Sequence, residues 1–557
     1  MAEMTLGPDE WRIVFENLDR QELCNVCLVT RSCCGLATPL LYKSITLIQA
    51  DTGFPYTRSR KPDHTSRHWN LLDRLEDVRN DSLRNFVQEV TIASPDGERT
   101  DTAYLRRLKE DGCLAKLIAR LPNIRKINLS LSVFQTDDFI RSICTHSNKP
   151  ELTLKLNNHC AFADQPVPCI SSLRAWLNPF WERNGPNRKV PELQQLFFNC
   201  PNLRSFSLQL SGNYGGCVAH IPHFPQILSF QLTGKEVFPP LEELSLDGYR
   251  MGDDEWVHWH DRFQWSRLLI LTVGPQDTFG LFDRIAGYIT SLTTLRVFKY
   301  ADERTPDREG LERFLVSFDS LTTLELKGYI CSVDAIGHHE QLTSLCLHED
   351  EPVRGGAQRR VLTAQELDYL DSHCPNLRSL KVDIQRGNDE MPEDVLQKLA
   401  TGFRRLQDLS IHFELGIANR DKVIRPVLNY ASARGIGQSF FDQRRQSEID
   451  TTTSYALTLW TGSSFRRFPQ WEPEYSLFEK NYTATFELRL ADDSADELVF
   501  RHHEREDKER RDSTPGRRSG PAPWEINGVE EAVEGAVDGW DNRRKFGSFP
   551  LAKAPPS

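Results

Sequence analysis

The stretch Cys-Pro-Asn-Leu-Arg-Ser-Leu-Lys-Val at residues 374–382 carries the pattern from which the fold can be predicted. Leu377, Leu380 and Val382 are apolar, and the last two alternate with polar residues, as in a strand with one buried face. The proline interrupts a helix and favours an extended backbone around it. We therefore expect a helix to end near Cys374 and a strand to begin a few residues later.

The same spacing of three apolar residues recurs along the chain, with starts typically 21 to 35 residues apart. The other clear copies are Leu203/Phe206/Leu208, Leu241/Leu244/Leu246, Leu268/Leu271/Val273, Leu292/Leu295/Val297, Leu321/Leu324/Leu326, Leu342/Leu345/Leu347 and Leu406/Leu409/Ile411, and the weaker ones are Val87/Val90/Ile92, Ile124/Ile127/Leu129 and Leu154/Leu156. A period in this range is typical of solenoid proteins, in which each repeat packs on its neighbours.

Helical patterns lie between these copies. Leu311, Phe314 and Leu315 recur at helical spacing, a capping box at residues 363–366 precedes another apolar face, and Pro392 opens a third helix. One candidate copy, beginning at Ile227, starts only 14 residues before Leu241 and leaves no room for a helix, so we expect a hairpin or insertion there. Each regular unit is thus expected to be one strand plus one helix.

This alternation resembles the leucine-rich repeats, and residues 200–203 and 374–377, both Cys-Pro-Asn-Leu, resemble their cysteine-containing subclass. The resemblance implies an α/β solenoid whose concave strand face binds ligands. The alternative is an ordinary α/β domain with leucine-rich strands. The residues expected to bind a substrate on that face are Arg296, Phe298, Glu325, Lys327, His348, Lys381, Asp383 and His412, whose charges of both signs favour a protein or peptide over a polyanion.

Three short helices are predicted before the repeats. Trp11, Phe15 and Leu18 share one helical face, Asp19 and Glu22 form a capping box for the next helix, and a third apolar face spans residues 33–41. Three helices in about forty residues bury little surface by themselves, so we expect them to need a partner.

Residues 6–18, followed by Leu23, Val26 and Val29, resemble an F-box in order and spacing, and residues 38–47 are similar to the segment that leads many fungal F-box proteins into their repeats. The family's Leu-Pro pair is here Leu6-Gly7-Pro8, with proline one place late. The resemblance implies binding to the Skp adaptor, and through it to cullin, in an SCF-type ubiquitin ligase. The implied contacts are Leu6, Pro8, Trp11, Phe15, Leu18, Leu23, Val26 and Val29. The alternative is a plain helical cap on the solenoid.

Composition excludes other classes of protein. The chain has 557 residues, so it must form several domains or one repetitive body, and its net charge of −11 argues against a partner such as nucleic acid. Neither a signal peptide nor an apolar run long enough to cross a bilayer is recognisable, which predicts a cytoplasmic or nuclear protein. Thirteen scattered cysteines then predict reduced, mostly buried thiols.

Signatures of catalysis are scarce. Cys24 and Cys27 resemble half of a zinc motif, but no second pair follows at metal spacing, so packing is the preferred interpretation. We expect no catalytic residue, metal or cofactor, which suits a receptor that only holds a substrate near a transferase. A repeat scaffold without a role in ubiquitin transfer is the alternative, and a hydrolase or transferase within the α/β body is the remote third class.

The predicted organisation has five parts: an F-box at residues 1–47, a linker and helix at 48–84, the solenoid at 85–433, a β-rich cap at 434–501 and a disordered tail at 502–557. The tail combines charges of both signs with proline and glycine, and few of its side chains are aliphatic. Removing residues 505–557 is therefore expected to leave folding stability unchanged.

Overall fold

A computed structural model of the chain divides it into two compact units, residues 1–383 with 402–407, and residues 384–401 with 408–557. The structure describes residues 7–48, 71–92, 112–130, 136–157, 165–177, 189–210, 230–247, 249, 251–274, 280–298, 308–328, 331–349, 351, 360–384, 391–415, 428–447, 455–462, 483–491 and 494–502. The predicted tail lies outside these residues, except for His502.

The first unit begins with three helices, α1 (Pro8–Glu16), α2 (Arg20–Val26) and α3 (Arg31–Lys43). The predicted capping box of α2 is present, because Asp19 accepts a hydrogen bond from the Glu22 amide and Glu22 accepts one from the Asp19 amide, each at 2.8 Å. Phe15, Leu23 and Ala37 form the core of these helices. The chain then passes directly from α3 into the first strand.

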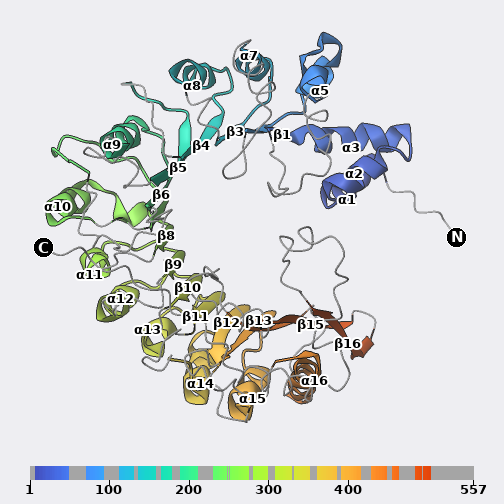
Figure 1. Cartoon of the computed structure of the whole chain (residues 1–557), viewed down its shortest axis with the longest axis vertical. Coiled ribbons are helices and arrows are strands. Elements are labelled where there is room, and N and C mark those ends of the chain that lie inside the picture. The colour runs from blue at the N-terminus through green and yellow to red at the C-terminus, as the bar shows by residue number, and fades with distance from the viewer. Residues whose placement is uncertain are drawn as a thin grey trace, which may run out of the picture. The chain divides into compact units, whose positions relative to one another are not determined.

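Twelve parallel strands follow among the described residues of this unit, each hydrogen-bonded to the next in chain order (Figure 1). They are β1 (Ser44–Ile48), β2 (Glu89–Ile92), β3 (Lys126–Leu129), β4 (Glu151–Asn157), β5 (Ile170–Leu177), β6 (Ser205–Leu210), β7 (Glu243–Asp247), β8 (Ile270–Val273), β9 (Thr294–Phe298), β10 (Thr323–Lys327), β11 (Ser344–His348) and β12 (Ser379–Ile384). The strand β5 carries a copy of the pattern that the sequence analysis missed, because Ala175 stands in the place of the last large apolar residue.

Helices connect most of these strands and lie along one side of the sheet, so that the strands form the inner side of the unit (Figure 1). The connecting helices are α5 (Asp81–Arg84), α7 (Cys113–Ala119), α8 (Asp137–Cys144), α9 (Lys189–Asn199), α10 (Asp253–Arg262), α11 (Leu281–Ile285), α12 (Arg308–Leu315), α13 (Val333–Gly337) and α14 (Ala364–His373), with short 3-10 turns at Val78–Asn80 and Trp265–Arg267. The predicted capping box at Thr363 and Glu366 begins α14.

The apolar residues of the repeated pattern form the core between sheet and helices. In β10, Leu324 and Leu326 are fully buried while Glu325 between them faces away from the core, and the same alternation occurs in β7 and β9. Burying one leucine side chain stabilises a fold by about 1.5–3 kcal/mol. This repeated ladder confirms the predicted α/β fold, a leucine-rich-repeat-like solenoid.

The asparagine of the Cys-Pro-Asn motif links successive repeats. The Asn376 side-chain amide donates a hydrogen bond to the Glu340 carbonyl at 3.1 Å, and that of Asn202 donates one to the Pro168 carbonyl at 2.9 Å. Cys200 and Cys374 are buried where α9 and α14 end, as the motif predicts.

No strand occurs at residues 230–242, where the sequence suggested a hairpin or insertion. Phe230 and Phe238 are instead buried against Phe197 of α9 and are part of an aromatic cluster that includes Trp259 of α10. Aromatic burial thus holds an irregular segment between β6 and β7.

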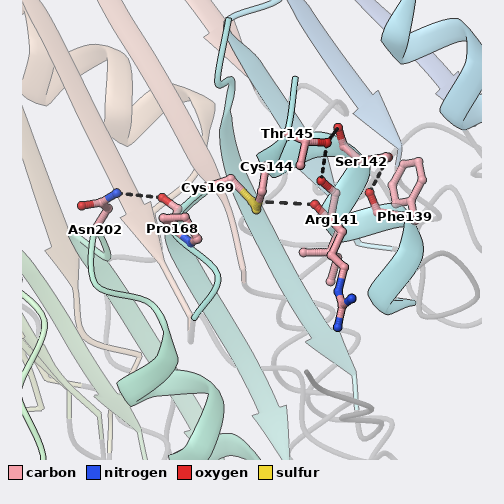
Figure 2. Close-up of a disulfide and its surroundings, with 9 residues drawn as sticks. Phe139, Arg141, Ser142, Cys144, Thr145, Pro168, Cys169 and Asn202 are labelled. Carbon is pink, nitrogen blue, oxygen red and sulfur yellow. Dashed lines mark hydrogen bonds between the residues drawn. A yellow bond between two sulfur atoms is a disulfide. The ribbon is translucent and has the colours of Figure 1, made fainter. Parts of the chain in front are cut away.

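The expectation of reduced, mostly buried thiols is wrong in two respects. Cys144, at the end of α8, and Cys169, just before β5, form a disulfide with their Cα atoms 5.0 Å apart (Figure 2). Of the nine free cysteines among the described residues, only Cys200, Cys331 and Cys374 are buried. The pair escaped prediction because its members are 25 positions apart in sequence, with all of β4 between them.

The second unit contains α15 (Glu393–Thr401), β13 (Asp408–Phe413), α16 (Tyr430–Gln446), β14 (Ala456–Thr461), β15 (Thr485–Ala491) and β16 (Ser494–His502). β13 pairs with β14 in parallel, and β14, β15 and β16 pair in antiparallel order. Residues 434–446, placed at the start of the β-rich cap from sequence, belong to the helix α16. Among the described helices of both units, none is long and apolar enough to cross a membrane.

Candidate protein-interaction surfaces

Two surfaces of the first unit gather residues that sequence analysis singled out. One is formed by the helices α1, α2 and α3 and the turn between the last two, and the other by the outward-facing residues of β9 to β12.

The three-helix module exposes five large apolar side chains. The exposed fractions are 41% for Trp11, 63% for Ile13, 42% for Val14, 85% for Leu28 and 69% for Val29. The first three belong to α1, and Leu28 and Val29 lie in the turn that follows α2. We call these five residues the helical apolar surface. Sequence reasoning had named Trp11 and Val29 as contacts but not Ile13 and Leu28, because neither fits the apolar stripe that packs on the core.

The other predicted adaptor contacts have different positions. Phe15 and Leu23 are buried in the core of the three helices, while Leu18 and Val26 are partly buried against it. Pro8 is exposed at the first position of α1, and Leu6 lies outside the described residues. The core residues thus hold the helices together, and the helical apolar surface is what they present to solvent.

The outward residues of β9 to β12 are brought side by side by the strand register. One row of the register, running across the strands from β9 to β12, contains Arg296, Glu325, Cys346 and Lys381. Two residues further along β9 and β10, Phe298 lies beside Lys327. The Glu325 carboxylate lies 3.4 Å from the Arg296 guanidinium and 2.9 Å from the Lys327 ammonium. Lys327 also lies over the Phe298 ring, 4.9 Å from its centre, in a cation–π contact.

We call Arg296, Glu325, Lys327 and Lys381 the cationic cluster, because three of its four side chains carry positive charge. Cys346 lies among them and stays a neutral thiol at pH 7, since burial raises its pKa to about 11. The cluster is a local basic region on a chain whose net charge is −11.

Three residues predicted on the substrate-binding face are buried instead. His348 and Asp383 form a pair, with Nδ1 and Oδ1 2.7 Å apart, and Asp383 also accepts a hydrogen bond from the Glu349 amide at 2.7 Å. In the second unit, the Nε2 atom of the buried His412 lies 2.9 Å from the Gly462 carbonyl oxygen, and its ring contacts Trp460. Each of these side chains is buried and has a polar partner inside the fold, so none of them belongs to the candidate surface.

Comparison with known proteins adds little to this description. No protein-family model matches the chain, and no curated protein matches it. Among solved structures, the chain is similar to one in the crystal structure of the TLR13-ssRNA13 complex, with a TM-score of 0.27 and 14% sequence identity. The match covers 60% of this chain and 46% of that chain, so it spans less than half of the TLR13 chain. A likeness this low carries no argument about function, and the repeat architecture is assigned from the register and burial of this chain alone.

Proposed function

We propose that this protein is the substrate-receptor subunit of an SCF-type ubiquitin ligase. In this proposal the helices α1 to α3 bind the Skp adaptor, which connects the protein to cullin, and the strand face of the repeats binds a protein substrate. The observation that carries the proposal is the helical apolar surface. Its exposed apolar side chains lie within residues 6–29, the segment that resembles an F-box.

The concentration of this surface supports an interface. Five of the eleven large apolar side chains exposed among the described residues lie between Trp11 and Val29. Scattered apolar residues are normal on protein surfaces, but a group of them in one small module is typical of a site that binds another protein. The core of Phe15, Leu23 and Ala37 is small, so a partner that covered the surface would also stabilise the helices.

A receptor of this kind needs no catalytic residue. Holding a substrate close to a transferase carried by another subunit raises the rate by proximity alone. The cationic cluster gives the repeats a polar, charged region suited to a protein or peptide ligand.

The second candidate function is a repeat scaffold that binds proteins without ubiquitin transfer, with α1 to α3 as a helical cap. Two observations favour this alternative: α3 passes directly into β1, and the Gln88 amide, just before β2, donates a hydrogen bond to the Lys43 carbonyl at the end of α3 at 2.9 Å. They attach the helices to the first two strands. Terminal caps of this kind protect the end of a solenoid core.

Adaptor binding distinguishes the two functions. Purified protein is mixed with a recombinant Skp adaptor, and complex formation is measured by calorimetry for the wild type, for Leu28→Asp and for Val29→Asp. Both variants are expected to lose at least tenfold in affinity, because each places a charge in an apolar contact. Val237→Asp is the matched control, since Val237 is 81% exposed but lies outside the three helices.

The F-box proposal fails if the wild type does not bind the adaptor, and the scaffold function then remains. It also fails if Leu28→Asp and Val29→Asp bind as tightly as Val237→Asp. Circular dichroism of each variant checks that the helices are still folded.

A further inference from the structure

We propose that the cationic cluster binds an extended acidic peptide in which two carboxylates lie four residues apart. The inference deepens the proposed function, since it names the chemical class of substrate segment that the repeat face would capture. It rests on the arrangement of Arg296, Glu325, Lys327 and Lys381 within the first unit.

Two of the three cations of the cluster are more exposed than its carboxylate. The side-chain exposed fraction is 41% for Arg296 and 35% for Lys327, but only 23% for Glu325, which both of them bind. A guanidinium has five N–H donors and an ammonium has three, so one shared carboxylate leaves donors for a second acceptor. A ligand approaching the cluster therefore meets positive charge first.

The acidic residue nearest Lys381 on β12 does not belong to this surface. Asp383 is buried, where it pairs with His348 and accepts the Glu349 amide hydrogen bond. Cys346, which lies between Glu325 and Lys381, contributes no negative charge at neutral pH. Among the half-buried or exposed charged side chains that the structure describes on these four strands, three are cations and one is a carboxylate.

The spacing of the cations selects the form of the ligand. Arg296 lies on β9 and Lys381 on β12, in the same row of the register and three strands apart. Neighbouring strands are about 4.8 Å apart, which places the two residues about 14 Å apart. In an extended peptide each residue advances about 3.4 Å, so side chains at positions i and i+4 are separated by nearly the same distance and point to the same side.

Hydroxyl groups complete the surface. Two residues before Arg296, Glu325, Cys346 and Lys381, the same four strands carry a row of partly exposed hydroxyl side chains. They are Thr294, Thr323, Ser344 and Ser379. A hydroxyl can both donate and accept hydrogen bonds, which suits the backbone of a peptide that crosses the strands. The cations therefore select acidic residues, whereas the hydroxyl groups do not discriminate between the other side chains of the peptide.

The probes are fluorescently labelled nine-residue peptides of glycine and serine that carry two glutamates one, two or four positions apart, and a peptide with two lysines four positions apart. Binding to the full-length protein is measured by fluorescence anisotropy. The peptide with glutamates four apart is expected to bind at least tenfold more tightly than the others, and to weaken between 50 and 300 mM salt because the contacts are ionic.

Three variants locate the site. Arg296→Glu combined with Lys381→Glu is expected to abolish binding, while Arg284→Glu combined with Arg313→Glu, the matched control on the helices α11 and α12, is expected to retain it. Glu325→Gln is expected to increase affinity severalfold, because it releases Arg296 and Lys327 from their own carboxylate. A general loss of folding would not produce this gain.

Several results would overturn the proposal: no binding of any glutamate peptide at 1 mM, equal binding of the lysine peptide, no dependence on spacing, or unchanged binding by the Arg296→Glu/Lys381→Glu variant. Adaptor binding is measured on the same proteins. If the protein binds acidic peptides but not the adaptor, the peptide site is supported and the SCF function is rejected. If it binds the adaptor but no acidic peptide, the SCF function is supported and the peptide site is rejected.

Discussion

The hydroxyl of Tyr249 donates a hydrogen bond to Oε1 of Glu255, and both side chains are buried. The indole N–H of Trp259 donates to the same oxygen at 2.9 Å, and the Tyr249 hydroxyl in turn accepts a hydrogen bond from the Phe230 amide at 3.0 Å. This network holds the irregular segment after residue 229 against α10. Burial outweighs these hydrogen bonds and raises the pKa of Glu255 to about 7.

The raised pKa of Glu255 predicts that stability falls as pH rises. The folded protein keeps a proton on Glu255 up to about pH 7, whereas the carboxyl group of the unfolded chain loses it near pH 4.5. The contribution of Glu255 to the free energy of unfolding is therefore complete below pH 4.5 and is lost as pH rises through 7. The difference between the pKa of Glu255 in the folded and in the unfolded chain corresponds to about 3 kcal/mol in the free energy of unfolding.

Thermal unfolding between pH 4.5 and 8 checks this prediction. Glu255→Gln, which cannot ionise, is expected to flatten the pH dependence relative to the wild type. Glu309→Gln is the control, because Glu309 is 85% exposed on α12. Equal pH dependence in Glu255→Gln and the wild type would contradict the assignment.

The disulfide between Cys144 and Cys169 is expected to stabilise the first unit. Its members are 25 positions apart, and closing a loop of that length corresponds to about 3.5 kcal/mol at 25 °C in the chain-entropy model. Cys144→Ser and Cys169→Ser should each lower the midpoint of urea unfolding to the value of the wild type treated with dithiothreitol. Peptide mapping without reductant should recover the linked pair, and its absence from oxidised protein would show that the bond does not form.

Much of the repeat architecture could be predicted because each strand carries its own signal. Leu324 and Leu326 alternate with polar residues, and proline and cysteine mark the helix ends, so a window of about ten residues suffices. The strand β5 was missed for the same local reason, since Ala175 weakens its pattern.

The surfaces were less predictable because burial depends on residues far apart in sequence. His348 occupies an outward position of β11, yet Asp383 on the next strand, 35 residues away, gives it a buried partner. The helical pattern places Phe15 and Leu23 in the core, and Ile13 and Leu28 fall at positions where this pattern expects polar residues. Their exposure is therefore evident only in the folded helices. The positions of the cations in the strand register likewise follow from pairing between repeats.

Asn376 is expected to contribute to stability by joining two repeats. Its side-chain N–H donates to the Glu340 carbonyl, and its side-chain oxygen accepts a hydrogen bond from Arg405. Asn376→Ala removes both contacts and is expected to lower the free energy of unfolding by about 1–2 kcal/mol. Asn376→Asp keeps the acceptor for Arg405 but lacks the N–H donor. It should therefore remain destabilised in urea unfolding, and wild-type stability in Asn376→Asp would contradict the role of the donor.

Gly274 is expected to tolerate no side chain, because the preceding repeat approaches its backbone closely. Its amide donates a hydrogen bond to the Leu246 carbonyl at 2.6 Å, just after β8 ends. A Cβ atom at this position would lie 2.7 Å from the Asp247 Cα atom, which belongs to the backbone of β7 and cannot move without disturbing the pairing of the two strands.

Gly274→Ala should therefore lower the free energy of unfolding by about 1–3 kcal/mol, as overpacking does in other cores. Gly35→Ala is the matched control in the same unit, since Gly35 lies in α3 with no atom within 4 Å of the added carbon. It should raise stability by up to about 1 kcal/mol, because alanine favours a helix more than glycine does. Urea unfolding followed by tryptophan fluorescence measures both, and a stable Gly274→Ala variant would show that β7 and β8 can separate at this point without cost.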